Sequence, residues 1–209
     1  MQYPGRQDRR HEPLIDAIPE LADRIMDALG PWLDRPFAFF GHSMGAVLGY
    51  EVARRARERG VPPPSRFFSS GRRAPSVHRS SEIHLRDDAG LAAELRRVGG
   101  TDRRFLDDPE LLEAILRVAR NDYRAIETYR WEPGAPLDCP ATVLVGDGDD
   151  HTTVDDASAW RELFTGAFDL RVLPGGHFYL DAQRPAVLDV ITRALVRPGA
   201  PASPGGGGR

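Results

Sequence analysis

Short apolar runs alternate along the chain with longer stretches in which apolar residues recur at helical spacing. Four runs fit strands buried in a sheet: residues 37–40, 66–70, 141–145 and 170–173. Helical patterns cover residues 18–33, 46–55 and 186–196. Strands that alternate with helices favour a mostly parallel sheet with helices on both faces. The pattern therefore predicts an α/β fold.

One segment, residues 76–131, breaks the alternation because it has helical patterns, such as residues 91–95 and 109–116, and no strand signal. A helical insertion between two strands can be a lid over a site, and on pattern alone it can equally be a set of extra core helices. The predicted organisation is a core in two parts with a helical lid between them and a Pro/Gly-rich, disordered tail: residues 1–75, 76–131, 132–197 and 198–209.

Composition mainly excludes alternatives. A chain of 209 residues suits one core, and its net charge of −3 gives no sign of nucleic-acid binding. No apolar stretch approaches the ~18 residues of a membrane span. The single cysteine, Cys139, cannot form an internal disulfide, which fits a reducing cytoplasm. No His or Cys spacing suggests a metal site. We expect a cytoplasmic monomer.

The strongest chemical signal is the sequence Gly41-His42-Ser43-Met44-Gly45. A serine at the tip of a sharp strand-to-helix turn is a nucleophile whose neighbours must lack bulk. The following backbone N–H, that of Met44, would lie at a helix N-terminus and stabilise an oxyanion. The bare pattern arises by chance in about one such chain in ten. Its place between a predicted strand and a predicted helix favours catalysis by Ser43 over an ordinary glycine turn.

A serine hydroxyl needs a base, and His177 is the best candidate. It follows an apolar strand in a glycine turn, at the sheet edge where catalytic groups of open α/β folds gather. His11, His78 and His84 lie among charges, where a solvated imidazole is the default interpretation. His42 adjoins Ser43, so its side chain should point away from the serine hydroxyl.

The residue that orients the base should be a carboxylate. Asp147, Asp149 and Asp150 all follow the predicted strand at residues 141–145. The chain order Ser, Asp, His is the order of α/β-hydrolases. An acidic turn is the alternative, because Asp and Gly favour turns in any case, and spacing alone cannot choose among the three aspartates.

Taken together, these motifs resemble those of type II thioesterases of polyketide and nonribosomal peptide biosynthesis, in the α/β-hydrolase superfamily. The resemblance rests on five segments: residues 2–6, 41–46, 122–129, 146–149 and 174–179. It implies that Asp149, the second aspartate of a Gly-Asp-x-Asp turn, completes the triad. The family often has proline where this chain has Asp150.

The resemblance implies hydrolysis of acyl thioesters from the phosphopantetheine of acyl or peptidyl carrier proteins, which clears stalled or mis-primed chains, with no cofactor. A lid would close over the acyl arm, and Leu112→Trp on its inner face would change the preferred acyl length. Two alternatives remain: a hydrolase of small esters or amides on the same fold, and a truncated, non-catalytic carrier-binding protein.

The family also has a strand and a Pro-His-Ala-Gly-Gly-like loop before the segment that matches residues 2–6. That loop supplies the second oxyanion N–H, and residues 1–12 contain no replacement for it. We therefore expect about 30 to 40 further residues upstream of Met1 and poor catalysis by the chain as printed.

Overall fold

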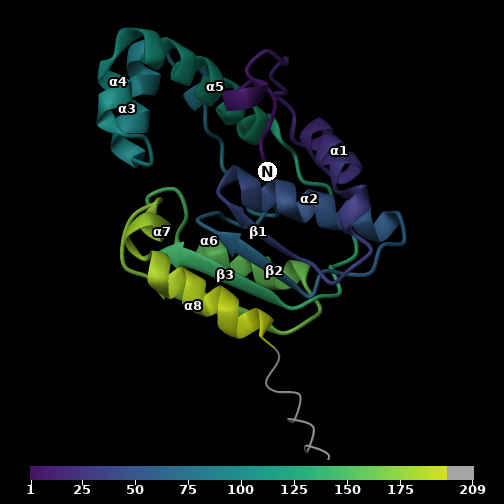
Figure 1. Ribbon diagram of the computed structural model, residues 1–209. Coiled ribbons are helices and arrows are strands. Elements are labelled where there is room, and N and C mark those ends of the chain that lie inside the picture. Colours follow the sequence, from purple (N-terminus) through teal and green to yellow (C-terminus); the bar gives the residue numbers. More distant parts are fainter. Residues whose placement is uncertain (197–209) are drawn as a thin grey trace, which may run out of the picture.

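The computed structural model describes residues 1–196, so the tail predicted for residues 198–209 lies outside the described residues. Its centre is a parallel sheet in the order β1-β2-β3-β4 (Figure 1). The strands are β1 (Ala38–His42), β2 (Arg66–Ser70), β3 (Ala141–Gly146) and β4 (Phe168–Leu173). Each coincides with a predicted strand to within two residues at either end. The α/β class with a parallel sheet is confirmed.

Helices cover both faces of the sheet. Neighbouring residues of a strand point to opposite faces, so each strand packs against helices on both sides. Phe67 of β2 packs with Tyr50 of α2 (Met44–Glu58) and with Trp160 of η4 (Ala159–Leu163). Phe68, one residue further on, packs instead with Val187 of α8 (Arg184–Leu195). Figure 1 shows α2 and α8 on opposite sides of the sheet.

The remaining elements of the core are short or peripheral. Helix α1 (Ile18–Leu29) packs on α2, and its buried face includes Ile18, Leu21 and Met26. The other short elements are η1 (Gln7–Arg9), η2 (Gly30–Trp32), α6 (Val154–Ser158) and α7 (Tyr179–Ala182).

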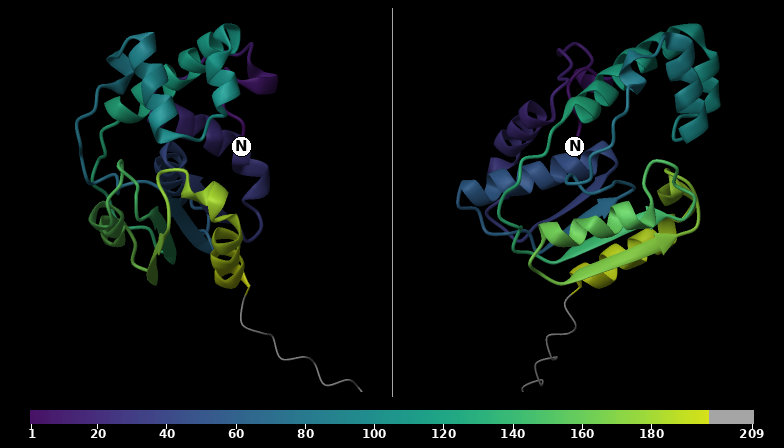
Figure 2. Two further views of the ribbon diagram at one scale, coloured as in Figure 1. Left: turned by 90° about the vertical axis from the view of Figure 1, so that its left-hand side faces the viewer. Right: turned by 180° about the vertical axis from the view of Figure 1, so that it is seen from behind.

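The segment from 76 to 131, called the lid after the role predicted for it, contains η3 (Ile83–Leu85), α3 (Asp88–Val98), α4 (Arg103–Asp107) and α5 (Pro109–Thr128). Asp87, Asp102 and Asp108 cap the three α-helices by accepting backbone N–H bonds. The lid has a small apolar cluster of its own, built from α3, α5 and η3. Figure 2 shows these helices lying apart from the sheet, beyond α2.

Contacts with the first half of the chain hold α5 in place. Arg6 donates two hydrogen bonds of 2.8 Å to the carboxylate of Asp122. The Tyr129 hydroxyl, just after α5, donates to Glu51 Oε1 at 2.8 Å. These two contacts, one within α5 and one directly after it, fix the long lid helix to the core. Helices α3 and α4 extend from it (Figure 1).

Candidate active site

The turn from β1 to α2 presents Ser43 in a strained conformation. Its φ of 53° and ψ of −120° lie in a region that side-chain-bearing residues rarely adopt. A Cβ at Gly41 would come within 2.1 Å of the carbonyl oxygen of Gly45, so position 41 must be glycine. At Gly45 the nearest atom to a Cβ is the Tyr3 hydroxyl at 3.7 Å, an ordinary contact. The tightness of the turn therefore depends on Gly41.

Three segments distant in sequence bring Ser43, His177 and Asp149 together. Ser43 Oγ lies 3.0 Å from His177 Nε2, and His177 Nδ1 lies 2.9 Å from Asp149 Oδ2. Asp149 follows β3 and His177 follows β4, so both lie at the carboxyl edge of the parallel sheet, as Ser43 does. This geometry lets the imidazole accept the serine proton while the carboxylate holds the ring.

The structure gives the three aspartates after β3 different surroundings. Asp147 Oδ1 accepts a hydrogen bond from the backbone N–H of Gly175 at 2.9 Å. Asp150 is exposed and pairs with Arg97 at 3.0 Å. Only Asp149, which is buried, contacts His177.

The Asp149 carboxylate is held in its charged form. Burial would raise its pKa, but the hydrogen bond and charge of His177 and the backbone N–H of His151 outweigh that effect, so the pKa is lowered. An ionised carboxylate at this position can stabilise an imidazolium on His177.

Met44 is the first residue of α2, a position whose backbone N–H has no acceptor within the helix. Ser43, directly before it, is the N-cap. The helix dipole also favours negative charge at this end. These properties are those required of the oxyanion donor predicted at Met44.

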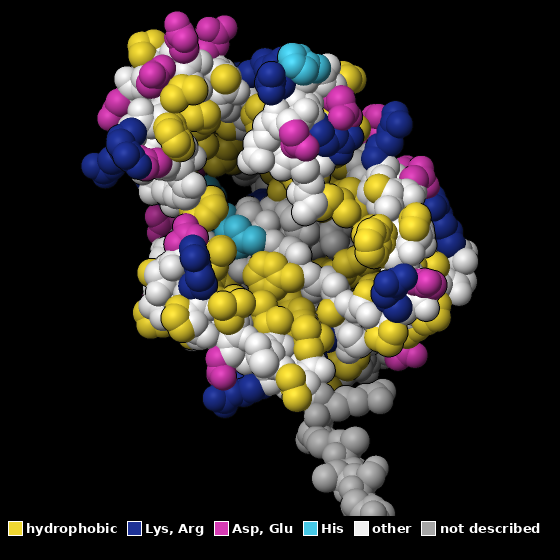
Figure 3. All heavy atoms as spheres, viewed as in Figure 1, with side chains coloured by type: hydrophobic (Ala, Val, Ile, Leu, Met, Phe, Trp, Pro, Cys, Tyr) yellow, Lys and Arg dark blue, Asp and Glu magenta, His cyan; other side chains and the backbone are white. Residues whose placement is uncertain are grey.

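A cavity of about 500 Å³ opens over Ser43 between the core and the lid. Leu95, Val98, Tyr123 and Ile126 line it from the lid side. Figure 3 shows the hollow between the lid and the core, with histidine side chains at its edge.

Leu112 does not line this cavity. It packs in the lid's own apolar cluster and borders a separate hollow on α5. Its helical spacing identified an apolar face but not which neighbour that face meets. Changes meant to alter the cavity over Ser43 therefore belong at Leu95 or Val98, not at Leu112.

The family model described as Thioesterase domain matches residues 1–195. The chain belongs to this thioesterase family. The cadicidin biosynthesis thioesterase of Streptomyces griseus is 48% identical over 195 residues, which are 93% of this chain and 54% of that protein. Thioesterase PikA5 of Streptomyces venezuelae is 44% identical over 203 residues, 96% of this chain and 72% of that protein.

Among solved structures, the type II thioesterase BorB from the borrelidin biosynthetic cluster is 44% identical with a TM-score of 0.86, covering 93% of this chain and 80% of BorB. The chain thus spans about half the length of the first relative named above and about three quarters of the others. These findings confirm the predicted α/β-hydrolase fold and the resemblance to type II thioesterases.

His42 has a larger part in this candidate site than its sequence position suggested. As expected, its side chain does not bond Ser43: its Nδ1 lies 2.9 Å from Ser70 Oγ, which in turn lies 2.6 Å from the Tyr179 hydroxyl. Its ring, however, packs against His177 with the centroids 5.0 Å apart. Burial, together with the charge of His177, lowers the pKa of His42 to about 4. His42 is therefore a neutral wall behind the predicted base.

This burial predicts a pH dependence of stability. Between pH 6.5 and about 4 the unfolded chain protonates His42 and the folded chain does not, so the free energy of unfolding should fall with falling pH, by roughly 3 kcal/mol in total. Urea unfolding of wild type and His42→Gln across this range measures the difference. The variant should lose less stability, whereas His11→Gln, at an exposed position, should behave as wild type. Equal pH slopes for wild type and His42→Gln would contradict the prediction.

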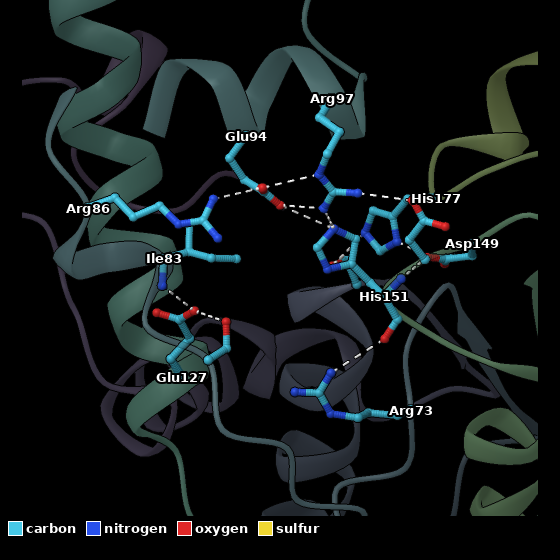
Figure 4. Close-up of polar contacts among 12 residues, drawn as sticks. Arg73, Ile83, Arg86, Glu94, Arg97, Glu127, Asp149, His151 and His177 are labelled. Atoms are coloured by element: carbon cyan, nitrogen blue, oxygen red, sulfur yellow. Dashed lines mark hydrogen bonds and ion pairs between the residues drawn. The ribbon is translucent and has the colours of Figure 1, made fainter. Parts of the chain in front are cut away.

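His151 links the loop after β3 to the lid. The sequence did not single it out, because a histidine in an acidic turn carries no distinctive pattern. Arg97 of α3 donates to His151 Nε2 at 2.9 Å (Figure 4). The same ring nitrogen lies 3.4 Å from buried Glu94. Burial and the charge of His177 lower the pKa of His151, so it accepts as a neutral ring. The backbone N–H of His151 donates to Asp149, which itself bonds His177. The residue that contacts the lid therefore also contacts the partner of the predicted base.

Within residues 1–196, no helix is long and apolar enough to cross a membrane. The same residues contain no group of three or more His, Cys, Asp or Glu side chains placed to hold a metal ion.

Proposed function

We propose that this chain hydrolyses acyl thioesters carried on the phosphopantetheine arm of acyl or peptidyl carrier proteins in polyketide or nonribosomal peptide synthesis. The observation that carries the proposal is the continuous hydrogen-bond chain from Ser43 through His177 to Asp149 at the floor of a cavity under the lid. The type II thioesterase relatives support the choice of carrier-bound thioesters over other acyl compounds.

In the first half of the reaction, Ser43 Oγ attacks the thioester carbonyl and His177 Nε2 accepts its proton. The carbonyl oxygen becomes an oxyanion, to which the Met44 N–H donates a hydrogen bond. The carbon–sulfur bond then breaks, and the pantetheine sulfur leaves with the proton from His177. The acyl group remains as an ester of Ser43.

In the second half, His177 accepts a proton from water, whose oxygen attacks the acyl-enzyme. Collapse of this intermediate returns the proton to Ser43 Oγ and releases the free acid. Asp149 keeps Nδ1 of His177 protonated throughout and stabilises the imidazolium that forms in both halves.

The lid, residues 76–131, would control access to this chemistry. Its helix α5 is tied to the core by the Arg6–Asp122 and Tyr129–Glu51 contacts. Near its α3 end, Arg97 donates to Asp150 and His151 of the core, and Gly100 lies against the Phe178 ring. The phosphopantetheine arm can then enter where α3 moves away from the core, while the fixed helix α5 preserves the acyl cavity.

Purified chain should be assayed with one acyl group on three supports: a holo carrier protein, free pantetheine and p-nitrophenol. We expect kcat/KM to be highest on the carrier, and only the carrier reaction to decline steeply with salt, because acidic carrier proteins dock through arginines. Ser43→Ala is the control for background hydrolysis.

Two outcomes would contradict the proposal. Turnover of the p-nitrophenyl ester without preference for thioesters would indicate a general esterase. Carrier binding without Ser43-dependent turnover of any of the three compounds would indicate a non-catalytic binding protein.

A further inference from the structure

Arg72 enters the cavity from the same sheet edge as the triad. It follows β2 by two residues, after Gly71, whose φ of 57° places its backbone against His42. A Cβ at Gly71 would lie 2.6 Å from the His42 ring and 3.5 Å from the carbonyl oxygen of His177. The backbone carbonyl of Arg72 accepts a 2.7 Å hydrogen bond from the Trp160 indole. The main chain at Arg72 is therefore fixed beside the site, and its side chain lines the cavity over Ser43.

The Arg72 guanidinium lacks the partners that other half-buried arginines have. Its Nε is buried without a hydrogen bond, and within the described part of the chain no side-chain hydrogen bond or ion pair of Arg72 is found. Arg6 and Arg66 also have an unpartnered Nε, but their terminal nitrogens bond Asp122 and Thr142.

An unpaired cation in such a place costs free energy, and this cost lowers the pKa of the group. Burial, reinforced by the charge of Arg73, lowers the pKa of Arg72 to about 9, against the opposing charges of Glu127 and Asp149. The group is still protonated at neutral pH. A cation that is partly desolvated, unpartnered and open to a cavity can be completed by an anion that enters that cavity.

We propose that Arg72 is a specificity-determining residue that binds a carboxylate at the far end of the acyl group, so that the cavity selects carboxyacyl thioesters. This inference rests on the proposed thioesterase function. The planar guanidinium matches a carboxylate with two parallel hydrogen bonds. The lid side of the cavity, at Leu95, Val98 and Ile126, offers apolar contact to the carbon chain between the thioester and that carboxylate.

The phosphate of the phosphopantetheine arm is the other anion that a carrier substrate brings. The whole pantetheine separates this phosphate from the thioester. Arg72, in contrast, lines the same cavity as Ser43, and the charge of Asp149 affects its pKa. The position of Arg72 favours the acyl carboxylate.

The test compares thioesters of free pantetheine, which lack the phosphate. Malonyl, succinyl and glutaryl thioesters are each paired with the neutral acyl group of equal chain length. In wild type, one carboxyacyl length should be preferred, and that length measures the reach from Ser43 to Arg72. In Arg72→Met, the carboxyacyl-to-neutral ratio of kcat/KM should fall about ten- to a hundredfold, the value of a charge-assisted hydrogen-bonded pair.

Arg73→Met is the matched control, because it removes the adjacent cation, which does not line the cavity over Ser43 and donates to the backbone carbonyl of His151. It should leave the ratio unchanged. A second measurement does not depend on turnover. Free succinate or glutarate should raise the melting temperature of Ser43→Ala and fail to raise that of Ser43→Ala/Arg72→Met.

An unchanged ratio in Arg72→Met overturns the proposal, as does an equal fall in Arg73→Met, which would indicate a general electrostatic effect. If Arg72→Met slows only phosphopantetheinyl substrates and not pantetheine thioesters, the cation binds the phosphate of the arm and the acyl assignment is wrong. Failure of the proposed function gives a different result: no Ser43-dependent hydrolysis of any thioester, with the dicarboxylate effect on melting still reporting on Arg72.

Discussion

Ser43→Ala is expected to lower the hydrolysis of acyl thioesters by several powers of ten, with little change in the melting temperature. The hydroxyl is the only group on the Ser43 side chain that the reaction uses, and losing a triad nucleophile removes the covalent route altogether. Alanine fits wherever serine does, so the strained backbone at φ 53° is no worse in the variant. Single-turnover hydrolysis of an acyl-carrier substrate measures the loss.

Covalent labelling gives an independent check on the nucleophile. A fluorophosphonate should attach to Ser43 in wild type and leave Ser43→Ala unlabelled, as peptide mass spectrometry would show. A label on any other residue, or hydrolysis that survives in the alanine variant, would refute the assignment of Ser43.

Asp149→Asn should cost on the order of a thousandfold or more in kcat, with little change in KM. The asparagine has nearly the same shape, but its amide cannot stabilise the imidazolium and can favour the wrong tautomer of His177. Asp147→Asn should change kcat little, because the amide oxygen can still accept the hydrogen bond that the Gly175 N–H donates to Asp147. Steady-state kinetics of these two variants on one thioester distinguish the triad carboxylate from its neighbour.

Asp150→Asn completes the comparison. Asp150 is exposed and loses only a surface pair with Arg97, which is worth at most about 1 kcal/mol. We expect small effects on kcat from Asp147→Asn and Asp150→Asn. Equal losses in all three variants, accompanied by lower melting temperatures, would mean that the segment is an acidic structural turn.

Most of the fold was predictable from sequence because it depends on local patterns. The runs at residues 67–70 and 141–145 lie in the strands β2 and β3, both covered on two faces and therefore continuously apolar or small. The start of helix α5 has a local signal, because Asp108 is its N-cap and Pro109 is its first residue. Short elements such as α4 and α6, of five residues each, are too brief for a periodic signal.

The site was predictable only in part, for a physical reason. Ser43 and His177 follow apolar strands in glycine turns, and that context is written in the sequence around each residue. The choice of Asp149 came from the family resemblance, since spacing left three aspartates open. The places of His42, His151 and Arg72 depend on how loops from different strands meet, and neither residue type nor spacing records that. The mistaken placement of Leu112 has the same origin.

The position of Glu94 has a consequence for how freely the lid can move. Buried Glu94 is paired with Arg86 at 3.0 Å and Arg97 at 2.7 Å, and all three residues belong to the lid. In the opening proposed for the lid, α3 would lift from the core and Glu94 would travel with both of its counterions. The polar contacts of α3 that would be lost are those to neutral His151 and to exposed Asp150. Such an opening would separate Glu94 from neither arginine, so we expect its electrostatic barrier to be low.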